Sequence, residues 1–250
     1  MTIETTIKTA PALITYEAVK DDEKVFQSMT SLLIAEFDIL LKHFESTWNK
    51  RACKDSEEHS ADNKKVGRPP VLKLAQDKLL FILFYLKTYP LQEVIGFLFG
   101  LSQPQANYWI HLLSDVLKET LKAMDFMPER ASSELLAKLE AEGKQNFSID
   151  GTERHINRPQ DDEEQKNHYS GKEKAHTVKN VLIVGNSDRE VKYLSDTAEG
   201  KKHDKKVADE SQIALPEESN LLQDTGFQGY QPEGVNIIQP MKKPKGKEFD

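Results

Sequence analysis

The chain has 250 residues, enough for one large domain or two small ones, with the composition of an ordinary soluble globular protein. Its formal charge of −7 argues only weakly against a nucleic-acid partner, because acidic and basic residues are segregated along the chain. The longest apolar run, residues 79–86, is too short to cross a bilayer, and the N-terminus lacks a signal-peptide pattern. A single cysteine excludes a disulfide framework, so we expect a cytoplasmic protein with no membrane contact.

The first quarter of the chain divides into three stretches. Residues 1–24 show no hydrophobic periodicity, and we expect them to be disordered. Residues 25–48 carry apolar side chains at helical spacing, which predicts an amphipathic helix. Residues 50–70 are charged and contain Gly-Arg-Pro-Pro, which indicates a linker or mobile arm. We assign residues 25–125 to a helical domain and residues 126–145 to a connecting helix and linker.

Within the helical domain, residues 71–122 predict three successive helices. The first covers about residues 71–87, and the second ends at Gly100, which suits the left-handed position after a helix. Ser102 begins the third helix, and Gln105 follows three residues later, as in a capping box. Two short helices joined by a tight turn to a longer third helix predict a helix-turn-helix.

The exposed N-terminal face of that third helix would enter the major groove of DNA. Gln and Asn side chains can pair with adenine edges there. The candidate base-reading residues are Gln103, Gln105, Asn107 and Tyr108. A plain bundle of three helices with a polar surface would show the same periodicity, so the pattern leaves that alternative open.

From residue 146 to residue 250 the sequence changes character and becomes rich in short β segments. These segments cover residues 146–150, about 176–185, 190–195, 220–224 and 235–239, with a polar helix at about 203–213. Three strands, a helix and two further strands are the ribonuclease-H-like order. The fold class we expect is therefore α+β or α/β: an all-helical helix-turn-helix domain, then an incomplete ribonuclease-H-like mixed sheet with helices.

Such a sheet would bring together two carboxylates that are far apart in the sequence, Asp150 and Asp224. Each aspartate follows an apolar run, and a Gly-containing turn comes after it. Paired carboxylates suit Mg²⁺ or Mn²⁺, which prefer oxygen ligands, and such metals support in-line displacement at phosphorus. Aspartates near glycine are often simple turn residues, and spacing alone does not exclude that reading. The cations that could hold a DNA strand nearby are Arg154, Arg158, Lys172, Lys174 and Lys179.

Several segments together carry a family resemblance. IDGTERHINRP, NHYSGKEKAHTVKNVLIVG, HDKKVADE, LLQDTGFQGY and IIQPMKKPKGKEF resemble, in order and spacing, the bacterial insertion-sequence transposases of the DDE endonuclease superfamily. The helical block resembles the helix-turn-helix that precedes this domain in the same family. The resemblance covers about residues 25–250. It implies that Asp150 and Asp224 are the first two catalytic acids and metal ligands, with Mg²⁺ or Mn²⁺ as cofactor and no organic cofactor.

The resemblance also implies double-stranded DNA as the partner, namely transposon terminal repeats and target, in the bacterial cytoplasm at the nucleoid. It suggests that His176, Lys242, Lys243 and Lys245 contact DNA. A homodimer would allow two transposon ends to be held together. The third acid of the family, a Glu on a later helix, would follow KPKGKEFD, and Glu248 precedes any such helix. We therefore expect impaired cleavage and strand transfer, with a non-catalytic fragment that represses the intact transposase as the alternative.

Overall fold

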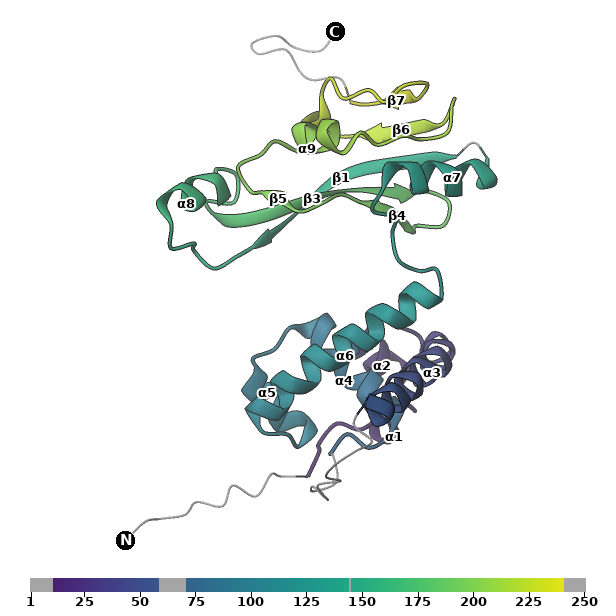
Figure 1. The fold of residues 1–250 in the computed structure, drawn as a ribbon, viewed down its shortest axis with the longest axis vertical. Coiled ribbons are helices and arrows are strands. Elements are labelled where there is room, and N and C mark those ends of the chain that lie inside the picture. The colour runs from purple at the N-terminus through teal and green to yellow at the C-terminus, as the bar shows by residue number, and fades with distance from the viewer. Residues whose placement is uncertain (1–10, 59–70, 144, 241–250) are drawn as a thin grey trace. The chain divides into compact units, whose positions relative to one another are not determined.

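The computed structural model describes residues 11–58, 71–143 and 145–240. The chain divides into two compact units, residues 1–126 and 127–250 (Figure 1). Each unit has its own hydrophobic core. Within the described ranges, no helix is long and apolar enough to span a membrane.

All regular secondary structure among the described residues of the first unit is helical. Its elements are α1 (Tyr16–Val19), α2 (Glu23–Thr30), α3 (Ile34–Glu58), α4 (Ala75–Thr88), α5 (Gln92–Phe99) and α6 (Gln103–Ala123). The last three are the helices expected within residues 71–122. Gly100 ends α5 with a positive φ of 68°, as the sequence predicts.

The N-terminal stretch is more ordered than the sequence suggests. Residues 1–10 are outside the described residues, but the expectation of disorder is wrong for residues 11–24, which contain α1. The backbone amides of Leu13 and Ile14 both donate to the carbonyl of Leu98. The ring of Tyr16 stacks on Phe37 at a centroid distance of 5.3 Å. These tertiary contacts order a segment whose own sequence has no periodic pattern.

The single helix expected over residues 25–48 is two helices. Ser31 has a left-handed backbone with a φ of 66°, and it ends α2 before α3 begins at Ile34. The helix then continues to Glu58, so residues 50–58 are helical and not part of a linker. Residues 59–70 of the expected arm lie outside the described residues.

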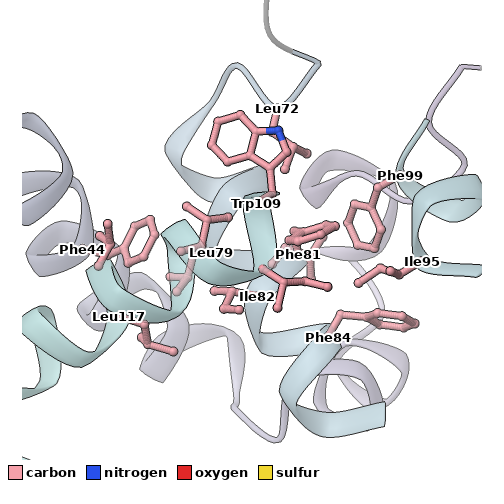
Figure 2. Packing of buried hydrophobic residues seen from close by; sticks show 14 of the residues in the cluster. Phe44, Leu72, Leu79, Phe81, Ile82, Phe84, Ile95, Phe99, Trp109 and Leu117 are labelled. Carbon is pink, nitrogen blue, oxygen red and sulfur yellow. The ribbon is translucent and has the colours of Figure 1, made fainter. Parts of the chain in front are cut away.

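The core of the first unit lies between α4 and the helices around it. Figure 2 shows side chains from α3, α4, α5 and α6 packed together, including Leu79, Phe81 and Ile82 of α4. All three are fully buried because contacts with α2, α3 and α6 surround their helix. Lys78 is also buried, with its ammonium 4.9 Å from the centre of the Trp48 ring and within hydrogen-bond distance of the Lys73 carbonyl.

The second unit combines one sheet with helices. Its strands are β1 (Asn146–His155), β2 (Tyr169–Ser170), β3 (Ala175–Gly185), β4 (Val191–Leu194), β5 (Ala198–Glu199), β6 (Asn220–Gln223) and β7 (Asn236–Ile238). Its helices are α7 (Ser132–Glu142), α8 (Asp162–His168), α9 (Asp204–Ser211) and the short 3-10 helix η1 (Thr225–Phe227).

The strand order is the ribonuclease-H-like one that the sequence predicts. The main path of the sheet is β2-β3-β1-β6-β7, and β4 and β5 pair with β3. β1 and β3 form a long antiparallel pair, whereas β6 joins the other edge of β1 in parallel, after the chain has passed through α9. The α+β class with a partial ribonuclease-H-like sheet is therefore confirmed.

One face of this sheet packs against helices. Phe147 and Ile149 of β1 are buried in one cluster with Leu135 of α7 and Val207 of α9. Because side chains alternate along a strand, residues 148, 150, 152 and 154 of β1 point to the opposite face. That opposite face carries the candidate site.

Candidate active site

Asp150 and Asp224 lie side by side at the ends of two adjacent parallel strands. The ladder between β1 and β6 pairs Phe147 with Leu221 and continues to Ile149 and Gln223. The next step in each strand is the aspartate, and neighbouring strands are about 4.8 Å apart. Both side chains therefore emerge on the face opposite α7 and α9. The two carboxylates that the sequence singled out are brought together by the fold.

Both carboxylates are exposed and line one open cleft of about 780 Å³. The Oδ1 atom of Asp224 accepts a hydrogen bond from the backbone amide of Gly226 at 2.8 Å, which fixes the turn after β6. The Oδ1 atom of Asp150 accepts from the amide of Gly151 at 2.8 Å. The second oxygen of each carboxylate makes no hydrogen bond with the described residues. Each exposed carboxylate therefore has an oxygen available to bind a hard divalent cation.

The pair is not joined by a third potential ligand within the part of the chain that the structure describes. No group of three or more His, Cys, Asp or Glu side chains there is arranged to hold a metal ion.

The candidate phosphate-binding cations lie in different environments. Arg154 points to the same sheet face as Asp150, and its Nη2 donates to Asn180 at 2.7 Å. Lys172 and Lys174 are exposed in the turn between β2 and β3. His176, on β3, is half-buried with its ring 5.8 Å from that of Tyr169. Lys242, Lys243 and Lys245 lie outside the described residues.

Lys179 is on the helix-covered face and not beside the aspartates. Its ammonium is buried, 3.1 Å from Oδ1 of Asp204 on α9 and 3.8 Å from Oε2 of Glu153 on β1. An ammonium held between two carboxylates in this way joins β1, β3 and α9. In this conformation the charge of Lys179 is committed within the protein and does not face the cleft that contains Asp150.

Glu153 has a pKa below its ordinary value. Burial alone would raise that pKa, but hydrogen bonds from Ser170 and Thr177 and the charge of Lys179 outweigh the effect of burial. The hydroxyl of Thr177 donates to Oε1 of Glu153 at 2.5 Å. The sequence offered no signal for this role, because the partners of Glu153 come from separate strands.

Three of the four candidate base-reading residues make hydrogen bonds within the helix-turn-helix itself. Oε1 of Gln105 accepts from the backbone amide of Ser102 at 3.0 Å, so this side chain caps α6. Gln92 of α5 donates from Nε2 to Oδ1 of Asn107 at 2.9 Å and accepts from Nε2 of Gln103. Tyr108 is 60% exposed. Gln92 was missed from sequence because it belongs to the preceding helix.

Comparisons with known proteins agree with this architecture. Residues 72–123 match the family model described as the helix-turn-helix of DDE superfamily endonuclease. Residues 149–250 match the model described as DDE superfamily endonuclease. A curated relative, the probable transposase for insertion sequence element IS702 of Microchaete diplosiphon, is 29% identical over 187 residues. That match covers 74% of this chain and 64% of the relative's length. No solved structure matches the chain significantly.

Proposed function

We propose that this chain is a transposase of the DDE endonuclease superfamily, which breaks and joins DNA phosphodiester bonds at transposon ends. The proposal is carried by the register that places Asp150 beside Asp224 at the open face of the sheet. The DNA would be double-stranded, comprising terminal repeats and target. Its setting would be the bacterial cytoplasm at the nucleoid, with a homodimer holding two ends.

Asp150 and Asp224 would hold Mg²⁺ or Mn²⁺ through the oxygens that the backbone amides leave uncommitted. When bound, such ions activate the attacking water or hydroxyl and stabilise the leaving 3′ oxygen during in-line displacement. Arg154, which points to the same sheet face as Asp150, would bind a phosphate of the strand being cut. Glu153 points to the sheet face that the helices cover. Through its ion pair with Lys179, which also binds Asp204 of α9, it would hold β1 in position.

The helix-turn-helix would recognise the DNA sequence through α6. Gln103, Asn107 and Tyr108 lie on its N-terminal half, where side chains of a recognition helix reach base edges. Gln92 would fix the orientation of the two amide side chains. Gln105 would act mainly as the cap that begins the helix.

The test uses purified full-length chain and a DNA duplex that carries the ends of its element. We expect nicking that requires Mg²⁺ or Mn²⁺ and is lost in Asp150→Asn, whereas DNA binding is unchanged in that variant. Cutting by Asp150→Asn at the wild-type rate would contradict the assignment of the site.

As the alternative, we propose that cleavage and strand transfer by this chain are impaired and that it acts as a repressor of the intact transposase. Specific DNA binding without any metal-dependent cutting would favour a repressor that occupies transposon ends. Efficient strand transfer would exclude both the impairment and the repressor.

A further inference from the structure

A second cleft lies at the far end of the antiparallel pair β1 and β3 and takes no part in the chemistry proposed above. Its volume is about 730 Å³. Figure 1 shows α8 at this end of the sheet and α7 at the other. The residues that line the cleft are Arg158, Asp162, Gln165, Lys166, Tyr169, His176 and Lys201.

The cleft carries cations that are not neutralised. Lys166 and Lys201 are exposed, and neither makes an ion pair with any residue that the structure describes. Arg158 donates from Nε and Nη2 to Oε1 of Gln165, at 2.9 and 2.7 Å, and this neutral partner leaves its charge intact. Asp162 is the one carboxylate among the lining residues. With histidine neutral, three cations and one carboxylate give the lining a net charge of +2.

The other carboxylates of the acidic run at the start of α8 do not line this cleft. Residues 162, 165 and 166 of α8 line the cleft at the spacing of one helix face. Glu163 and Glu164 are not among the lining residues, and Asp161 caps the helix by accepting from their backbone amides. The helix therefore presents one carboxylate, one amide and one ammonium group to the cleft, and the net positive charge comes from Arg158 and Lys201.

The cleft opens on the same sheet face as the two aspartates. The β1–β3 ladder pairs Asp150 with Leu182 and continues without a break to His155 and Thr177. His176 is six residues from Leu182 along β3, so the alternation of the strand places both side chains on one face. Tyr169 pairs directly with His176 across β2 and β3. Six residues of strand span about 20 Å, which separates the cleft from Asp150.

We infer that this cleft binds backbone phosphates of the duplex DNA that flanks the phosphodiester held at Asp150 and Asp224. The inference rests on the proposed function and extends it to a second DNA contact. Arg, Lys and Tyr side chains commonly bind DNA phosphates. A separation of about 20 Å corresponds to about six base pairs at 3.4 Å each, so the contacted phosphates lie about six base pairs from the cut.

The experiment measures binding of the full chain to a fluorescein-labelled duplex carrying the element's end, by fluorescence anisotropy in EDTA. The slope of log affinity against log salt concentration reports the number of phosphate contacts. We expect Lys166→Ala and Lys201→Ala each to reduce the magnitude of this slope by about 0.9. The matched control is Lys206→Ala, an exposed lysine of α9 on the helix-covered side of the sheet, which should leave the slope unchanged.

A variant that is expected to raise the DNA affinity distinguishes the loss of a phosphate contact from misfolding. Asp162→Asn removes the carboxylate of the cleft and should tighten binding at constant salt, an effect that a loss of structure does not produce. Wild-type slopes in both lysine variants would overturn the inference, whether or not the chain cuts DNA. Unchanged cutting by Asp150→Asn would instead overturn the proposed function, while the slopes would still decide whether the cleft binds phosphate.

Discussion

Asp204 of α9 occupies the space beside the backbone of Gly151 in β1. A Cβ atom on Gly151 would lie 2.8 Å from Cγ of Asp204 and 3.0 Å from its Oδ1. The same Oδ1 atom pairs with Lys179, so a larger residue at position 151 cannot be accommodated without disturbing that ion pair. The strand that carries Asp150 can therefore approach α9 closely because the next residue has no side chain.

Gly151→Ala should destabilise the second unit by about 1–3 kcal/mol, because the added methyl group displaces Asp204. The measurement is urea unfolding followed by circular dichroism. Both tryptophans, Trp48 and Trp109, belong to the first unit, so their fluorescence reports that unit separately. Gly171→Ala is the matched control, since a Cβ there meets nothing within 4 Å. Equal stability of the two variants would contradict the steric argument.

Asp224→Asn should reduce metal-dependent nicking by more than about a hundredfold, since changes even in the partners of metal ligands cost 10–100-fold. An asparagine oxygen can still accept from the amide of Gly226, so we expect the fold and DNA binding to survive. Rates of nicking in Mg²⁺ and in Mn²⁺ provide the measurement. Asp196→Asn, at a fully exposed aspartate side chain, is the control and should cut normally. A fully active Asp224→Asn variant would remove this residue from the site.

Glu153→Gln should lower stability at neutral pH but not in acid. The pKa of Glu153 is lowered in the folded protein from an unfolded value of about 4.3. Its stabilising contribution is therefore present above pH ~4.3 and is lost as the pH falls through the lowered folded pKa. Unfolding free energies of wild type and variant, measured from pH 7 downward, should converge. Glu173→Gln, at an exposed position, should show no such pH-dependent difference. A constant gap between the Glu153→Gln and wild-type curves would argue against this ionisation.

Gln92→Ala should weaken sequence-specific DNA binding by about tenfold, within the ~1–3 kcal/mol of one base contact. The reason is that Gln103 and Asn107 both hydrogen-bond to Gln92 and would lose their orientation. Competition between the element's end and unrelated DNA measures the ratio of specific to non-specific affinity. Glu93→Ala changes an exposed neighbour on the same helix and is the control. If both variants keep the wild-type ratio, Gln92 does not position the base readers.

The strands were predictable from local patterns, and the pairing of the two aspartates followed from the ribonuclease-H-like order of those strands. The run Phe147-Ser-Ile149 alternates as a half-buried strand does, and Asp150 follows it directly. Asp224 comes just after the strand that the apolar pair Leu221 and Leu222 indicates. Gly100 likewise marks the end of α5 through its own backbone freedom.

Other features were not predictable because they depend on the tertiary structure. Ser31 adopts a left-handed backbone without being glycine, so the break between α2 and α3 left no mark in the sequence. Lys179 looks like any basic strand residue, and only the register of β3 against β1 shows that it points to α9. The role of Gln92 could not be predicted because its hydrogen-bond partners belong to α6, and only the packing of α5 against α6 brings them together.

The parallel pairing of β1 with β6 also has a consequence for biosynthesis. On a ribosome, Asp150 emerges well before Asp224, and β6 can add to the sheet only after the intervening strands and α9 have been made. A nascent or partly degraded chain that lacks β6 carries one aspartate without its neighbour. Such a chain cannot assemble the carboxylate pair, so the proposed cleavage of DNA would begin only after β6 has joined the sheet.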